Sequence, residues 1–215
     1  MTASVTDRRH QQIAATLVEA LPYMRRFAGA TFVIKYGGSA MGSAVLAHDF
    51  TRDVVLLKQV GINPVVVHGG GPQIKAMLDR LKIKSEFVEG LRVTDAQTVE
   101  IVEMVLAGSI NKQIVTAIQA AGDEALGMSG KDGRLIEATK LMRSRHDPDS
   151  RIEELLDLGF VGQPSRIRTD VLTVLEGTQI VPVIAPIGMG ADGETYNINA
   201  DTRQARSPAR CGRAS

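Results

Sequence analysis

Apolar residues before position 30 recur three and four residues apart, which is the spacing of a helix that buries one face. The stripe in residues 7–27 consists of Ile13, Leu17, Leu21 and Met24, and Pro22 predicts a kink in this helix. An apolar stripe that precedes the first core strand is expected to pack against another surface. The sequence leaves two alternatives open: packing against the chain's own domain, or contact with another subunit.

The order strand, glycine-rich loop, helix occurs twice in the next part of the chain. A β-rich run at 31–34 leads through Lys35-Tyr36-Gly37-Gly38-Ser39 into a helical pattern at 43–60. A second run at 64–67 leads through His68-Gly69-Gly70-Gly71-Pro72 into another helix. Repeated units of this kind predict an α/β fold with an open, mostly parallel sheet and helices on both faces. In such sheets ligands bind at the carboxyl ends of the strands.

The rest of the chain is predicted as a mixture of helices and extended segments. An extended excursion at 86–94 precedes a long helix at 95–121, which is broken near Gly108. The later segments, in chain order, are a strand at 124–128, extended or hairpin segments at 134–140 and 159–167 around an exposed excursion at 141–154, a short helix from Thr169 to Gly177, a strand at 179–184 and a turn-rich stretch at 188–193.

Composition excludes several classes of protein. Lysine and arginine number 25 against 24 acidic residues, so no overall field attracts nucleic acid or a membrane surface, and an anionic ligand has to be held by local groups. One cysteine and four histidines offer neither an internal disulfide nor a zinc cluster. The N-terminus lacks a signal-peptide pattern, and no apolar run approaches the roughly 20 residues of a membrane helix. These features predict a cytoplasmic protein.

The two glycine-rich loops suit the binding of an anion, because backbone N–H groups approach an anion closely only where side chains are absent. Neither loop matches the GxGxxG pattern of dinucleotide-binding folds, and no GxxxxGK[ST] pattern occurs. The sequence therefore disfavours both Rossmann-type and Walker-type nucleotide binding.

Two side chains beside these loops are candidates for chemistry. Lys35 ends a buried strand next to Gly37 and Gly38, where its ammonium would face the same anion as the glycine amides. The alternative is a lysine that extends from a strand end to solvent. His68 precedes three glycines and could act as a base, but such a histidine is more often a structural hydrogen-bond donor.

Five phrases in this chain together resemble the N-acetylglutamate kinases of the amino acid kinase superfamily. They are Lys35-Tyr-Gly-Gly, Val67-His-Gly-Gly-Gly-Pro, Gly90-Leu-Arg-Val-Thr-Asp, Met128-Ser-Gly-Lys-Asp-Gly and Asn197-Ile-Asn-Ala-Asp. The first two are shared with the carbamate, aspartate, glutamate 5- and uridylate kinases, whereas the third and fifth indicate the acetylglutamate members. The resemblance covers residues 29–202 and implies the amino acid kinase fold.

The resemblance implies roles for the residues on the phosphate side of the site. Lys35 matches the lysine that neutralises charge on the transferring phosphoryl group, and Gly37 and Gly38 match the lining of the phosphate path. Asp201 matches a residue that positions catalytic lysines. The implied cofactors are ATP and Mg²⁺, and the resemblance assigns no protein ligand to the metal.

Four further residues are implied on the substrate side. Gly70 and Gly71 match glycines that contact N-acetyl-L-glutamate through their amides, and Arg92 matches the arginine that grips a substrate carboxylate. A surface ion pair is the alternative for Arg92. Asn197 matches a residue that hydrogen-bonds the substrate, and its spacing of four from Asp201 predicts that both lie on one helix face.

The implied reaction transfers the γ-phosphoryl group of ATP to the side-chain carboxylate of N-acetyl-L-glutamate, as a step of arginine biosynthesis. Positioning and charge neutralisation catalyse such an in-line transfer, so no covalent enzyme intermediate is needed. One competing hypothesis is a sibling kinase for another carboxylate or carbamate. A second is a non-catalytic module that binds acetylglutamate or only forms subunit contacts.

The chain is expected to divide into three parts: an N-terminal kinked helix at 1–28, an acetylglutamate-binding lobe at 29–202 and an arginine-rich tail at 203–215. Because the family continues into a nucleotide lobe where this tail stands, ATP binding and turnover by this chain are expected to be impaired. The tail is either a non-native ending or a basic arm. The N-terminal helix resembles that of arginine-inhibited hexameric members, which implies a homo-oligomer, dimeric or hexameric, and arginine feedback.

Overall fold

A parallel sheet forms the centre of the chain. A computed structural model describes residues 5–38, 40–88, 90–146 and 153–199. The sheet has the order β1-β2-β8-β5, with every neighbouring pair parallel. Its strands are β1 (Thr31–Tyr36), β2 (Asn63–His68), β8 (Val181–Ala185) and β5 (Ala125–Ser129). The predicted parallel α/β sheet is confirmed.

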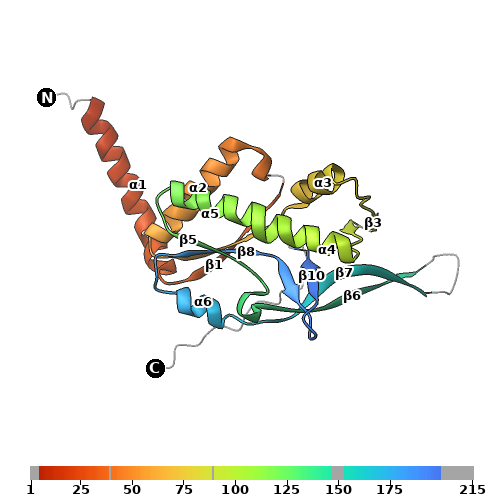
Figure 1. Cartoon of the computed structure of the whole chain (residues 1–215). Coiled ribbons are helices and arrows are strands. Elements are labelled where there is room, and N and C mark those ends of the chain that lie inside the picture. The colour runs from red at the N-terminus through yellow and green to blue at the C-terminus, as the bar shows by residue number, and fades with distance from the viewer. Residues whose placement is uncertain (1–4, 39, 89, 147–152, 200–215) are drawn as a thin grey trace, which may run out of the picture.

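Helices cover both faces of this sheet (Figure 1). One face carries α2 (Ala44–Gln59), α3 (Gly71–Arg80) and a long helix made of α4 (Ala96–Glu103), η2 (Met104–Ile110) and α5 (Asn111–Ala120). Side chains of Val66 and Val183 pack there against Leu106 and Ile118. The opposite face carries the short helix α6 (Asp170–Leu175).

The long helix is continuous, and the predicted break near Gly108 is a π-helical segment, η2. The carboxylate of Asp95 caps its start by accepting a 2.7 Å hydrogen bond from the Thr98 amide. By length and composition alone the helix at 96–120 could cross a membrane, which corrects the expectation that no segment comes close. One such helix is weak evidence for a membrane span, because core helices pass the same test, and Val102 and Ile118 of this one are fully buried.

Four more strands close into a small barrel of order β10-β7-β6-β9. They are β6 (Ile136–His146), β7 (Glu153–Ile167), β9 (Ile187–Met189) and β10 (Thr195–Ile198). A separate hairpin pairs β3 (Phe87–Val88) with β4 (Leu91–Arg92), and η1 (Ala40–Gly42) and η3 (Asp132–Arg134) are short 3-10 helices. The exposed excursion predicted at 141–154 is partly wrong, since β6 runs to residue 146 and β7 starts at 153. The sequence prediction also missed β9 and β10.

The N-terminal helix α1 (Val5–Phe27) is confirmed, with Pro22 inside it. In Figure 1 it projects from the body of the protein. Ile13, Leu17 and Leu21 of its apolar stripe are 49%, 56% and 41% exposed. The described part of the chain therefore leaves this stripe largely uncovered, which favours the alternative of a subunit contact.

Candidate active site

A cavity of about 650 Å³ opens where both glycine-rich loops, the β3–β4 hairpin and β10 meet. Seven of the eight residues predicted for the site line it: Lys35, Gly37, Gly38, Gly70, Gly71, Arg92 and Asn197. The eighth, Asp201, lies outside the described residues. Segments that are far apart in sequence thus share one cavity, as expected at the carboxyl ends of parallel strands.

The two glycine loops pack directly against each other. A Cβ atom on Gly38 would lie 3.0 Å from Pro72 Cδ and 3.3 Å from Gly70 Cα, so a side chain there would push the loops apart. A Cβ on Gly70 would overlap the side chains of Leu106 and Ile110 in η2. A side chain at either position would therefore require neighbouring atoms to shift.

Gly37 and Gly71 differ from these glycines, because a Cβ on either would meet nothing within 4 Å. Both line the cavity, so the space beside them is available to a ligand. Gly71 is also the first residue of α3, and Pro72 carries no N–H in the first turn of that helix. The free amides of a helix N-terminus attract negative charge.

Within the part of the chain that the structure describes, every charged residue that lines the cavity is basic. These residues are Lys35, Lys75 and Arg92, and the ammonium of Lys75 pairs with Asp79 at 2.7 Å. The whole chain carries a net charge of only +1, so the positive character is local to the cavity. Low-dielectric walls strengthen such a local field, and the cavity is therefore suited to an anionic ligand.

Lys35 lies at the cavity, but the prediction that it ends a buried strand is wrong. β1 is an edge strand, and its face that carries Val33 and Lys35 is exposed, with Val33 at 70%. Its ammonium therefore needs no anion to compensate for burial. Its glycine neighbours and the cavity itself still favour an anion beside Lys35.

Arg92 is 7% exposed, which excludes the alternative of a surface ion pair. Its guanidinium donates hydrogen bonds to Ser85 Oγ and, at 3.3 Å, to the carbonyl oxygen of Gly71. The Phe87 ring stacks on it, with Cζ 4.5 Å from the ring centroid. Burial lowers the pKa of this guanidinium and the charge of Asp79 opposes that shift, but an arginine stays protonated at neutral pH. Arg92 thus ties the hairpin to the second glycine loop.

Asn197 lies on β10, so the prediction that it is helical is wrong. It pairs with Ile187 of β9 and with Val161 of β7. These partners fix the backbone at Asn197 on both sides. Asn197 therefore does not contribute to the predicted helix face.

His68 is fully buried, and its contacts are structural. Its Nδ1 lies 3.0 Å from the carbonyl oxygen of Gly69, and its Nε2 lies 3.3 Å from Nδ2 of Asn111. The Asn111 amide also donates to the carbonyl oxygens of Met128 and Val183, at 3.2 and 2.9 Å. These contacts support the structural reading of His68 over a catalytic base. Sequence reasoning missed Asn111, although a polar residue on the apolar face of a helix signals a buried network.

We expect His68 to make folding stability depend on pH. Burial lowers the pKa of this imidazole below its usual 6.5, against a weaker opposing effect of the hydrogen bond to Gly69. The imidazole of His68 is therefore protonated below pH 6.5 in the unfolded chain, whereas in the native chain it stays neutral to a lower pH. Stability is fully present above pH 6.5 and falls as pH decreases, with a slope of up to about 1.4 kcal/mol per pH unit.

Urea unfolding between pH 5 and pH 7.5 measures this slope. His68→Gln is expected to flatten it, while His48→Gln, which removes a 67% exposed side chain, is the matched control and should leave it unchanged. Equal slopes in all three proteins would show that His68 does not titrate on unfolding.

The described residues contain no group of three His, Cys, Asp or Glu side chains placed to hold a metal ion.

Comparison with solved structures supports the fold. The structure superposes on that of a Streptococcus mutans protein with a TM-score of 0.65 and 26% sequence identity, over 80% of this chain and 64% of the other.

Sequence comparison gives the family. Residues 30–205 match the amino acid kinase family. The acetylglutamate kinase of Rhodospirillum rubrum is 69% identical over 88% of this chain and 61% of its own length. That of Erythrobacter litoralis is 57% identical over the whole chain and 71% of its own length. The chain thus spans about three fifths of the length of the Rhodospirillum rubrum protein and 71% of that of the Erythrobacter litoralis protein. It belongs to the amino acid kinase family and, within that family, to the acetylglutamate kinases.

Proposed function

We propose that the cavity binds N-acetyl-L-glutamate. Arg92 would grip one carboxylate through its planar guanidinium, which presents paired donors in a suitable geometry. The amides of Gly70 and Gly71 and the side chain of Asn197 would hydrogen-bond the rest of the substrate. The observation that carries this proposal is that the charged residues lining the cavity, among those that the structure describes, are all basic where the glycine loops meet Arg92.

The reaction that we propose for the site is phosphoryl transfer from ATP to the side-chain carboxylate of N-acetyl-L-glutamate, in arginine biosynthesis. Lys35 would neutralise charge on the transferring group, with Gly37 and Gly38 beside the phosphates and Asp201 positioning catalytic lysines. Mg²⁺ would arrive with the ATP phosphates and reduce the repulsion between the two anions. A cytoplasmic location fits this use of ATP.

Calorimetric titration with N-acetyl-L-glutamate tests the binding proposal. We expect the chain to bind it, and Gly71→Ala to weaken binding at least tenfold, because the new methyl group enters the space proposed for the ligand. Gly37→Ala is the matched control, because a new methyl group at either glycine would meet no protein atom within 4 Å. Gly37 belongs to the proposed phosphate side, so this variant should keep its affinity for acetylglutamate. A wild-type chain that binds no acetylglutamate would overturn the proposal, and separate titration with ATP tests the nucleotide.

We also propose that α1 joins subunits of a homo-oligomer, because its stripe is exposed in the single chain. A variant that starts at Ala28 is expected to elute from a size-exclusion column as a smaller assembly than the whole chain. An unchanged elution volume, after correction for mass, would remove this role. Arginine feedback, which the family resemblance implies, remains a proposal that titration with L-arginine would check.

A further inference from the structure

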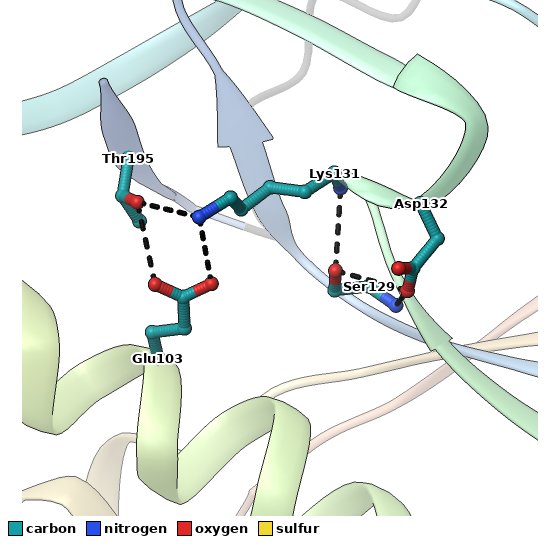
Figure 2. A network of polar contacts seen from close by, with 5 residues as sticks. All are labelled: Glu103, Ser129, Lys131, Asp132 and Thr195. Atoms are coloured by element: carbon teal, nitrogen blue, oxygen red, sulfur yellow. Dashed lines mark hydrogen bonds and ion pairs between the residues drawn. The ribbon is translucent and has the colours of Figure 1, made fainter. Parts of the chain in front are cut away.

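A polar cluster joins three separate parts of the fold (Figure 2). The ammonium of Lys131 lies 3.0 Å from Glu103 Oε1 and donates to Thr195 Oγ1 at 2.9 Å. The Thr195 hydroxyl in turn donates to Glu103 Oε2 at 3.3 Å. Glu103 ends α4, Lys131 follows β5 and Thr195 begins β10. Contacts within the cluster therefore fix the distance between the long helix, the end of the sheet and β10.

The loop that carries Lys131 is itself held in place. The Asp132 carboxylate accepts hydrogen bonds from the Ser129 amide at 2.6 Å and the Ser129 hydroxyl at 3.2 Å. Ser129 Oγ accepts a further bond from the Lys131 amide at 3.3 Å. A Cβ on Gly130 would overlap the carbonyl oxygen of Ile187, so this loop packs tightly on β9. The backbone at Lys131 is therefore held in place by these contacts.

On two elements, residues of the cluster are close in sequence to residues that line the cavity. Thr195 and Asn197 are two residues apart on β10, so their side chains project from the same face of the strand. Glu103 lies one turn before Leu106 on the long helix. Both Asn197 and Leu106 line the cavity. The contact between Thr195 and Glu103 thus sets how closely β10, with Asn197, approaches the helix.

We infer that Lys131, Glu103 and Thr195 are positioning residues, which hold Asn197 where it meets the substrate. This inference rests on the proposed binding of N-acetyl-L-glutamate. The Lys131 and Glu103 side chains are 29% and 33% exposed, and an ion pair of that exposure adds little to folding stability. Its main effect is geometrical, so its loss should change ligand affinity more than the unfolding midpoint.

Affinity for N-acetyl-L-glutamate, measured by calorimetry, is the first test. Lys131→Met and Thr195→Val are expected to raise Kd about 3- to 10-fold, the worth of one hydrogen bond that is no longer well aligned. Thr195→Ser keeps the hydroxyl and should bind as tightly as the wild type. Lys140→Met is the matched control, because it breaks a lysine–aspartate pair of 2.7 Å on the β6–β7 hairpin.

A double-mutant cycle separates positioning from general weakening of the fold. In an Asn197→Ala background, Lys131→Met should have no further effect on Kd, because the group that it positions is gone. An equal loss of affinity in both backgrounds would overturn the inference.

A second readout needs no ligand. The side-chain amide NMR signal of Asn197 should move in Lys131→Met and stay in place in Lys140→Met. An unmoved signal would also overturn the inference. If instead the signal moves but the wild-type chain binds no acetylglutamate, the positioning role stands and only the proposed ligand is wrong.

Discussion

In a protein of the full length of its acetylglutamate kinase relatives, replacing Lys35 with alanine is expected to lower the rate of acyl-phosphate formation about 100- to 1000-fold. Lys35 lines the cavity beside Gly37 and Gly38, where the proposed reaction builds negative charge on the transferring group. An ammonium placed there stabilises the transition state more than the bound substrate, so its loss acts on the rate. The affinity for N-acetyl-L-glutamate should change by less than about threefold, since other residues are proposed to bind that substrate. Trapping the acyl phosphate with hydroxylamine measures the rate.

Lys75→Ala is the control for a general loss of positive charge. Lys75 lines the same cavity, but its ammonium pairs with Asp79 on the next turn of α3, and the two side chains are 62% and 58% exposed. We expect a change in rate of less than about fivefold. Equal losses in the two variants would mean that only the overall potential of the cavity matters. A loss of acetylglutamate affinity in Lys35→Ala, without a loss of rate, would place Lys35 on the substrate side instead.

The repeated strand–loop–helix units could be predicted because their signals are local. Ser43 precedes α2 and its hydroxyl accepts a hydrogen bond from the Leu46 amide at 3.4 Å, as expected of an N-cap. Glycine-rich loops follow β1 and β2 directly. Parallel strands place their carboxyl ends at one edge, so the shared cavity also followed from the order of elements.

Features that depend on distant pairing could not be predicted in this way. The exposure of β1 depends on its position at the edge of the sheet, in the order β1-β2-β8-β5. The residues of β1 itself do not indicate that position. Asn197 was expected on a helix because a spacing of four is compatible with one. The strand forms because β10 finds partners in β9 and β7, and pairing between strands overrides local preference.

The Lys131 cluster shows the same limit for the site. The phrase that contains Lys131 can be recognised in the sequence, but its partner Glu103 lies at the end of α4 and Thr195 lies in β10, which the sequence prediction missed. Nothing local to Lys131 distinguishes an ammonium that braces β10 from one that extends to solvent. Only the folded arrangement gives this phrase a physical role.

Replacing Arg92 with methionine is expected to weaken binding of N-acetyl-L-glutamate at least about 30-fold, which corresponds to about 2 kcal/mol or more for a desolvated charge pair. The guanidinium lies under Phe87 and is fixed by Ser85 and the Gly71 carbonyl, so it would meet a carboxylate without reorganising. Arg92→Lys should fail similarly, because one ammonium cannot hold both contacts and also present two parallel donors. Calorimetric titration measures both variants.

Arg80→Met removes the same charge from the exposed last turn of α3 and serves as the control. At about 0.15 M salt we expect it to change Kd less than twofold, since screening weakens exposed charges beyond about 8 Å. Because Arg92 is buried, each variant's unfolding midpoint has to be measured, and Arg92→Lys is the more conservative of the two. If a folded Arg92→Lys variant bound acetylglutamate as tightly as the wild type, the carboxylate would have to be held elsewhere. The remaining basic residues of the cavity, Lys35 and Lys75, would then be the candidates.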